Sequence, residues 1–275
     1  MIFHKVLLAA FALAFPAMAA AKDAYGSDWV DFREARVRLL VSKPETGATR
    51  ITGGLEILLE PGFKTYWRNA GDSGVPPSFD FSRSDGIGPA EVAFPFPDLF
   101  DDGAGGKAIG YKTSVILPFS APMTTPAPKI ALKLDFAVCG TMCIPLAGEF
   151  TLDTAHARMI EPEGAEKLAR NLAQVPRVAT SGEHARKVER VAIEPARFAI
   201  TLPWNGPEQG FAAFPEAASF AEILSCDPAP DGMKVIVALD KPPAGVGFGT
   251  LRLTYGTREN ALEQSIDLDA AKVTP

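Results

Sequence analysis

Two cysteines four positions apart, Cys139 and Cys143, are the residues of this sequence best suited to chemistry. The chain of 275 residues contains one further cysteine, Cys226. Three residues separate the pair, one more than in a thioredoxin-type C-x-x-C motif, and this spacing matches no common four-ligand zinc site. We therefore interpret the pair as a redox dithiol, which closes a disulfide and exchanges it with the thiols of other proteins.

Backbone geometry decides how the two sulfur atoms can meet. On a straight strand the cysteines would lie about 13 Å apart, and on a helix they would be poorly aimed, so neither element favours a disulfide. A hairpin whose loop is Gly140, Thr141 and Met142 makes them cross-strand neighbours, with Cα atoms about 4.5 Å apart. Pro145 has no amide hydrogen to donate, which predicts that the second strand lies at a sheet edge or begins there.

The cysteine pair has two alternative interpretations. A disulfide that closes so small a loop adds little stability through chain entropy, which favours exchange, but a structural clip of the hairpin is the first alternative. The second is a copper site, because Cys139, Met142 and Cys143 offer soft sulfur ligands that suit Cu(I). Cys226 lies in an apolar stretch and is interpreted as a small buried hydrophobic residue, with a third exchanging thiol as its alternative.

Short apolar segments separated by glycine and proline predict the strands that position the pair. The clearest of them ends at Cys139, and the next begins at Cys143. The strands expected in the first half are residues 34–42, 51–60, 91–96, 111–119, 129–138 and 143–152, with an Asp- and Gly-rich loop at 99–110. Many short strands with such turns indicate a mainly β protein built as an antiparallel β-sandwich.

A second unusual stretch, residues 61–81, gathers Tyr66, Trp67 and Arg68 before a turn-forming segment. Two consecutive prolines then force an extended backbone. The stretch is either a strand that ends in a surface loop, with its aromatic side chains in the core, or the lining of a pocket for a thiol or small molecule. The sequence leaves both interpretations open.

A helix expected at residues 162–174 divides the chain, because it carries an apolar stripe and is followed by Pro176. The strands expected beyond it are residues 188–193, 198–202, 234–239, 251–255 and 264–268. We therefore predict a β-sandwich domain at residues 20–153, a helical linker at 154–186 and a second, smaller β domain at 187–275.

The N-terminus has the pattern of a cleaved secretory signal peptide at residues 1–19. A basic start at Lys5 precedes an apolar run at residues 6–15, and Ala17 and Ala19 form a small-x-small cleavage site. The apolar run is too short to span a bilayer, so we expect an exported chain without stable membrane insertion. The net charge of -6 and the scattered basic residues argue against a nucleic-acid partner.

Several stretches together resemble one known family. They are PGFKTYWRNAGDSGVPPSFDF (61–81), FPFPDLF (94–100), IGYKTSVILPF (109–119) and LDFAVCGTMCIP (134–145). Their order and spacing are similar to those of the N-terminal periplasmic domain of DsbD/ScsB-type thiol:disulfide interchange proteins, a protein-disulfide reductase family. The C-x3-C spacing looks closest to the ScsB-like branch, which is associated with copper tolerance. The resemblance covers approximately residues 30–153.

The resemblance implies an immunoglobulin-like β-sandwich in the periplasm, with the dithiol at one edge and no cofactor. It implies that Cys139 and Cys143 are the catalytic pair, which takes electrons from a membrane-embedded thiol reductant and gives them to thioredoxin-like or disulfide-containing periplasmic proteins. The residues that match motif positions, and for which a pocket or cap role is implied, are Tyr66, Trp67, Arg68 and Tyr111. Full-length family members continue into a transmembrane conduit and a thioredoxin-like domain. Because the sequence ends before either, we expect its reductant to be a separate protein.

Overall fold

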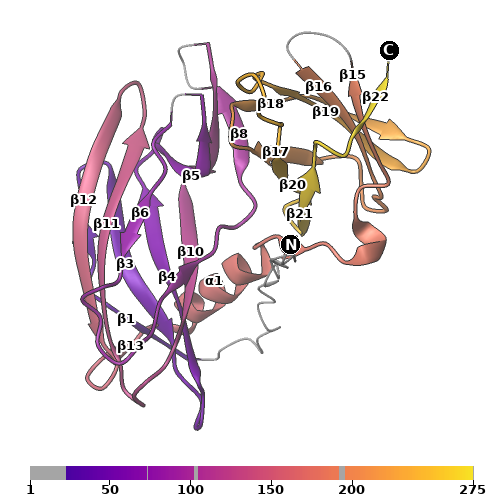
Figure 1. Cartoon of the computed structure of the whole chain (residues 1–275). Helices are drawn as coiled ribbons and strands as arrows, with labels where there is room; N and C mark the ends of the chain where they lie inside the picture. The colour runs from indigo at the N-terminus through magenta and orange to yellow at the C-terminus, as the bar shows by residue number, and fades with distance from the viewer. Residues whose placement is uncertain (1–22, 73, 102–104, 192–195, 275) are drawn as a thin grey trace. The chain divides into compact units, whose positions relative to one another are not determined.

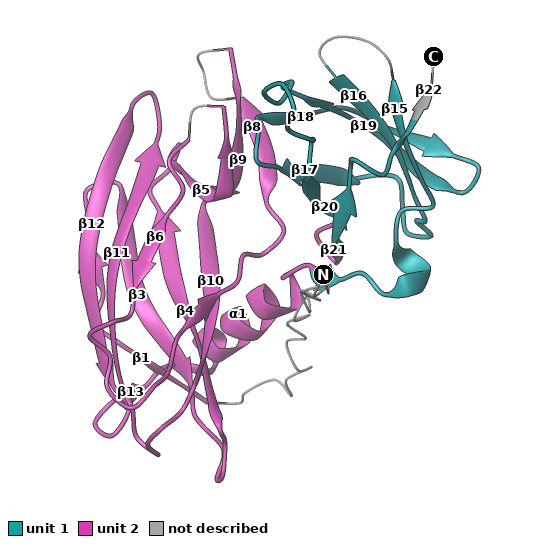
Figure 2. Cartoon of the chain, in the orientation of Figure 1, with its two compact units in different colours: residues 1–18, 177–256, 262–275 teal, residues 19–176, 257–261 magenta. Residues whose placement is uncertain are grey.

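The computed structural model describes residues 23–72, 74–101, 105–191 and 196–274 (Figure 1). The predicted signal peptide, residues 1–19, lies outside these described residues. The chain divides into two compact units, which Figure 2 colours separately. We call residues 19–176 with 257–261 the N-terminal unit, and residues 177–256 with 262–275 the C-terminal unit.

The N-terminal unit is an antiparallel β-sandwich. Its strands are β1 (Ala24–Gly26), β2 (Val30–Asp31), β3 (Ala35–Ser42), β4 (Arg50–Leu59), β5 (Lys64–Gly71), β6 (Ser78–Asp80), β7 (Glu91–Val92), β8 (Asp98–Asp101), β9 (Lys107–Lys112), β10 (Ser114–Pro122), β11 (Lys129–Cys139), β12 (Cys143–Asp153) and β13 (Arg158–Met159). One sheet has the order β13-β1-β3-β4-β10-β7, with β2 beside β3. The other, which we call the disulfide sheet, has the order β12-β11-β5-β9-β8, with β6 beside β11.

Alternating apolar side chains fill the space between the sheets, as the sequence pattern predicts. In β11, Ile130, Leu132, Leu134 and Phe136 are all buried. Phe136 packs edge-on against Phe32, whose ring centroid lies 5.7 Å away and which precedes β3 of the opposite sheet. Figure 1 shows the two layers that this contact joins. Each large side chain buried in this way stabilises the fold by about 1.5–3 kcal/mol relative to exposure.

Helix α1 (Pro162–Ala173) covers one face of the β3-β4-β10 region. It begins with a proline, which suits the first helical position because the missing amide hydrogen would have no partner there. Leu168 packs against Leu40 and Ile116 of that sheet. A Cβ atom at Gly54 would lie 2.8 Å from Leu168 Cδ1, so the glycine allows the close approach of the helix. The helix is therefore packed on the sandwich of the N-terminal unit.

The C-terminal unit is a smaller β structure. Its elements are β14 (Arg177–Val178), η1 (Ser181–Glu183), β15 (Lys187–Val191), β16 (Ala196–Leu202), β17 (Ala212–Glu216), β18 (Ala221–Ala229), β19 (Gly232–Leu239), β20 (Thr250–Thr257), β21 (Asn260–Asp267) and β22 (Lys272–Thr274). They form sheets of order β14-β21-β20-β17 and β18-β19-β16-β15-β22. Phe198, Trp204 and Tyr255 are buried in its core. The predicted fold class, a mainly β sandwich followed by a helix and a smaller β unit, is confirmed.

Two of the predicted elements near the site are wrong. The loop predicted at residues 99–110 contains parts of β8 and β9. The strand predicted at 111–119 is two strands, because Thr113, with a φ of 66°, turns the backbone between β9 and β10. These two strands belong to different sheets. Asp and Gly are enriched in tight hairpin turns as well as in long loops, so composition alone did not separate the two.

The carboxylate of Glu183 ties the first residues of the C-terminal unit together. It accepts hydrogen bonds from Arg177 Nη1 at 2.6 Å and from the Thr180 amide at 3.0 Å. The bond from Arg177, followed by that from Thr180, lowers the pKa of Glu183 to about 2. Because the folded-state pKa is depressed, these bonds stabilise the fold above the ordinary pKa of 4.5, and this stabilisation is lost as the pH falls towards 2.

We expect Glu183→Gln to lower the free energy of unfolding at neutral pH by at most about 1 kcal/mol, because the ion pair is largely open to solvent. The difference from wild type should shrink as the pH falls from 4.5 towards 2. Urea denaturation at neutral pH and in this acidic range measures both effects. Glu166→Gln, which removes an exposed helical ion pair with Arg170, is the matched control. A difference that stays constant with pH would contradict the expectation.

Candidate redox site

The cysteine pair lies at the tip of a hairpin. β11 and β12 pair in antiparallel register along their whole length, and the last pair is Cys139 opposite Cys143. Gly140, Thr141 and Met142 form the loop, in which the Gly140 amide donates to the Met142 carbonyl oxygen at 3.2 Å. β12 is the edge strand of the disulfide sheet. The predicted hairpin and its position at a sheet edge are confirmed.

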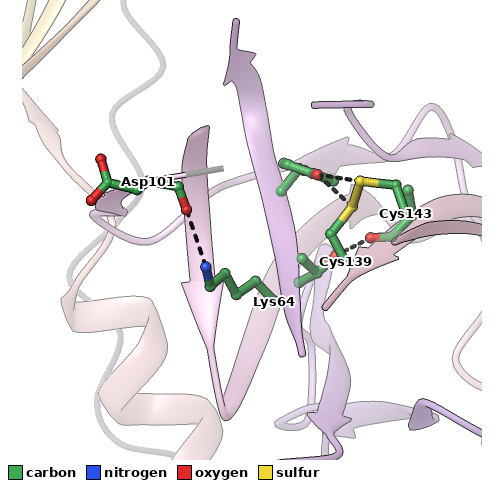
Figure 3. The surroundings of a disulfide bond; sticks show 7 residues. Lys64, Asp101, Cys139 and Cys143 are labelled. Atoms are coloured by element: carbon green, nitrogen blue, oxygen red, sulfur yellow. Dashed lines mark hydrogen bonds between the residues drawn. A yellow bond between two sulfur atoms is a disulfide. The ribbon is translucent and has the colours of Figure 1, made fainter. Parts of the chain in front are cut away.

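A disulfide joins the two cysteines, whose Cα atoms lie 4.1 Å apart (Figure 3). The two residues differ in exposure. Cys139 is buried, with 8% of its surface exposed, because its strand also pairs with β5 through Lys64. Cys143 begins the edge strand and is exposed. The disulfide therefore presents one residue to solvent and keeps the other inside the sheet.

The hydroxyl group of Tyr66 lies against both sulfur atoms. Its oxygen is 2.5 Å from Cys139 Sγ and 3.2 Å from Cys143 Sγ. Tyr66 belongs to β5, and only 2% of its surface is exposed. Its ring packs in a small buried cluster, whose other members are Ala70, Phe100, Ala108, Ala137 and Cys139. The core of the unit therefore holds this hydroxyl against the disulfide.

A bulge in β5 sets the position of Tyr66. Tyr66 pairs with Gly110 of β9, but the next paired residue of β5 is Gly71, so the four residues between them face a single residue of β9. A Cβ atom at Gly110 would lie 2.0 Å from the Thr65 carbonyl oxygen, so only glycine permits so close an approach of the strands. Gly74 lies on the Tyr66 ring, since a Cβ atom there would come within 2.5 Å of Tyr66 Cδ1.

Comparison with known proteins identifies the segment that carries this site. The family model described as "Thiol:disulfide interchange protein DsbD, N-terminal" matches residues 36–155, which include the hairpin and Tyr66. This segment matches the DsbD N-terminal family. The recognition made from the sequence motifs is therefore confirmed.

A solved structure has the same fold as this chain. It is the N-terminal periplasmic domain of ScsB from Proteus mirabilis, which has a TM-score of 0.66 and 19% sequence identity, over 88% of this chain and 98% of that chain. The predicted immunoglobulin-like sandwich is confirmed. A comparison with curated proteins gives no significant match. Among the described residues, no helix is both long enough and apolar enough to cross a membrane.

The other predicted cap residues lie near Tyr66 in the fold. Trp67 is fully buried, and the Arg68 guanidinium carbon lies 4.2 Å from its ring centroid. Tyr111, in β9, is also buried and donates a hydrogen bond to the Pro95 carbonyl oxygen at 2.8 Å. Burial raises the pKa of Tyr111 well above its ordinary value, so its hydroxyl stays a neutral donor. A pocket or cap role for Trp67, Arg68 and Tyr111 stays a prediction.

Two phenylalanines contribute to the site without having been predicted. Phe100, in β8, packs in the Tyr66 cluster, and Lys64 Nζ lies 4.7 Å from its ring centroid. Lys64 extends away from the disulfide and donates to the Asp101 carbonyl oxygen at 3.2 Å (Figure 3). Phe63 packs against the hairpin loop, where a Cβ atom at Gly140 would lie 3.2 Å from its ring. The aromatic residues of the FPFPDLF stretch were the signal that could have identified Phe100.

The structure also bears on the two other sulfur-based interpretations. Met142, the third ligand of the proposed Cu(I) site, is 71% exposed at the hairpin tip, but the cysteines are joined, so copper binding stays a prediction for the reduced pair. Among the described residues, no three His, Cys, Asp or Glu side chains gather as a metal site.

Cys226 is half-buried in β18, and burial raises its pKa to about 11. Its thiol is therefore protonated at neutral pH, which fits a small hydrophobic residue better than a nucleophile.

Proposed function

We propose that this chain is a periplasmic thiol:disulfide interchange protein, in which the Cys139–Cys143 pair passes electrons between a membrane reductant and periplasmic substrate proteins. The disulfide carries the proposal, because it lies at the tip of an edge hairpin with one cysteine exposed. It lies within a segment of a thiol:disulfide interchange family. The similar ScsB domain is described as periplasmic, which supports the same compartment together with the predicted signal peptide at residues 1–19.

The unequal exposure of the two cysteines assigns them different roles. A partner thiolate reaches the exposed Cys143, forms a mixed disulfide with it, and releases the buried Cys139 as a thiolate. A second thiolate of the partner then attacks the partner's own sulfur in the mixed disulfide and releases Cys143. The protein is then reduced and the partner oxidised. In the opposite direction, Cys143 attacks a substrate disulfide and Cys139 resolves the mixed disulfide.

Exposed apolar side chains near the disulfide support docking of a protein partner. Met142 is in the hairpin loop between the cysteines, and Val75, which is 55% exposed, directly follows the Gly74 that packs on Tyr66. Apolar side chains around a reactive group are typical of protein interfaces. A thioredoxin-like protein is the kind of partner that DsbD-type domains serve, so it is the proposed occupant of this surface.

The reduction potential of the pair tests the proposal against a structural clip. We expect a value above about −300 mV, because structural disulfides of secreted proteins lie below that value and exchanging ones above it. The measurement equilibrates the purified chain in glutathione or dithiothreitol redox buffers and counts alkylated thiols by mass spectrometry. Cys226→Ala serves as the background, because it removes the third thiol without touching the pair. A potential below this limit would make the disulfide a clip and contradict the proposal.

A further inference from the structure

We propose that Tyr66 is a catalytic residue of the exchange reaction. Its hydroxyl donates a hydrogen bond to Cys139 Sγ and stabilises the thiolate that Cys139 becomes when the disulfide opens. The inference rests on the proposed exchange function and deepens it, because it names a protein group that acts on the leaving sulfur atom.

The direction of the hydrogen bond follows from the chemistry of the groups. The sulfur atoms of a disulfide carry no hydrogen, so neither of them can donate to Tyr66, and its phenolic O–H is the donor. It has a single hydrogen, and Cys139 Sγ at 2.5 Å is nearer to the oxygen than Cys143 Sγ at 3.2 Å. Cys139 therefore receives the hydrogen bond, and Cys143 remains the sulfur open to attack.

The hydrogen bond becomes stronger as the reaction proceeds. A neutral disulfide sulfur is a weak acceptor, whereas a thiolate carries a full negative charge, and hydrogen bonds to charged groups are about twice as strong as neutral ones. Tyr66 and Cys139 are both buried, so little water competes for the new charge. An interaction that strengthens while the bond breaks lowers the barrier, because it stabilises the transition state more than the ground state.

The reaction balances without any further reactant. The partner thiolate attacks Cys143 Sγ, a bond forms between these two sulfur atoms, and the bond from Cys143 Sγ to Cys139 Sγ breaks. The electron pair of the broken bond stays on Cys139 Sγ, to which Tyr66 donates its hydrogen bond. Tyr66 keeps its proton throughout, since a phenol has an ordinary pKa near 10, above the ordinary thiol value of about 8.5.

The surroundings of Tyr66 hold its hydroxyl in place before the reaction begins. Gly74 lies on one side of the ring, and the close approach of Gly110 to β5 fixes the backbone. The Thr65 hydroxyl donates to the Ala137 carbonyl oxygen at 2.9 Å and ties β5 to the strand that ends in Cys139. A donor fixed in this way needs little rearrangement when charge develops on the sulfur.

Tyr66→Phe tests the inference, because it removes the hydroxyl and keeps the ring that packs in the core. We expect the second-order rate of reduction by dithiothreitol to fall at least about tenfold relative to wild type. Tyr255→Phe is the matched control, since it removes the hydroxyl of another buried tyrosine, one that donates to the Glu183 carbonyl oxygen in the other unit. This control should leave the rate unchanged.

A second measurement separates catalysis from a merely structural role. In a Cys143→Ser, Cys226→Ala background, Cys139 is the remaining thiol, and the pH dependence of its alkylation by iodoacetamide gives its pKa. We expect Tyr66→Phe to raise this pKa by about one unit or more, because the thiolate loses its donor. A structural role would lower the melting temperature and leave the pKa unmoved.

The experiments distinguish failure of the catalytic role of Tyr66 from failure of the proposed exchange function. An unchanged pKa of Cys139 in Tyr66→Phe would overturn the inference, whether or not the rate falls, and so would an unchanged rate. Dithiothreitol is a small-molecule reductant, so neither measurement requires a protein partner. If the wild-type potential instead lies below about −300 mV, the exchange function fails, even where Tyr66 still shifts the pKa of Cys139.

Discussion

Cys139→Ser should capture partner proteins as stable mixed disulfides, whereas Cys143→Ser should capture few or none. Cys143 is the exposed residue at the start of the edge strand, so in Cys139→Ser the thiol that meets partners is retained. The resolving thiol is missing in that variant, so the mixed disulfide cannot be cleared from within the chain. Of the pair, Cys143→Ser keeps the buried Cys139, whose sulfur contacts the Tyr66 hydroxyl and is difficult for a protein to reach.

Both substitutions should abolish catalysed electron transfer, because the remaining thiol of the pair has lost the partner with which it closes the disulfide. The two variants therefore differ only in the amount of mixed disulfide that each forms with partner proteins. Acid quenching of a periplasmic fraction, alkylation and non-reducing electrophoresis measure the trapped species, with Cys226→Ser as the control that keeps the pair intact. Equal trapping by the two variants, or more trapping by Cys143→Ser, would show that exposure does not assign their roles.

A small-molecule reagent tests the difference in accessibility between Cys139 and Cys143 without a partner protein. Cys139→Ser and Cys143→Ser are each combined with Cys226→Ala, so that one thiol remains, and the rate of its reaction with an aromatic disulfide gives its accessibility. We expect Cys143 to react at least about tenfold faster than Cys139. The buried Cys139 thiol can meet the reagent only when the edge of the sheet opens locally.

The hairpin that carries the cysteine pair could be predicted, because the sequence features that specify it lie within a few residues of one another. The loop between the cysteines contains a glycine, the strand before Cys139 alternates cleanly, and Pro145 excludes a central strand. These features act over a few residues, so the hairpin, its register and its edge position follow from the sequence. The spacing of the cysteines alone does not decide their chemistry, because it fits a clip, a copper site or an exchanging pair.

The contact between Tyr66 and the sulfurs could not be predicted in the same way. It depends on a bulge of β5 opposite β9, and on the close approach of Gly110 to the Thr65 carbonyl oxygen. Gly110 lies in a stretch whose composition indicated a loop, so the strand that positions the tyrosine was not recognised. Long-range pairing of this kind leaves no periodic signal in either strand.

Two strands of the C-terminal unit that were not predicted, β17 and β18, contain a proline. β17 contains Pro215 and β18 contains Pro228, and proline within an apolar segment argues against a central strand. Both strands lie at the edges of their sheets, where a residue without an amide hydrogen is tolerated. A proline in such a segment is therefore evidence against a central strand but not against an edge strand.

Trp67→Ala should cause the largest loss of stability among the substitutions considered. The side chain is fully buried, and truncation of a buried tryptophan costs about 3–5 kcal/mol, because apolar burial is lost and a cavity remains. Arg68 stacks on the same ring, so its guanidinium also loses its support. The residue lies in the bulge that directly follows Tyr66, so the fold of the site depends on it.

The measurement is urea denaturation of the oxidised chain followed by circular dichroism, with the transition of each unit fitted separately, since a chain with two units need not unfold in one step. Trp29→Ala is the matched control in the same unit. Trp29 is only half-buried, and its ring is flanked by Arg36 and Arg38, so its loss should be smaller. Trp67→Phe should recover most of the stability and the exchange rate, because it refills the core without adding a polar group. If Trp67→Ala were no more destabilising than Trp29→Ala, Trp67 would belong to an adaptable pocket wall rather than to the core that holds Tyr66 in place.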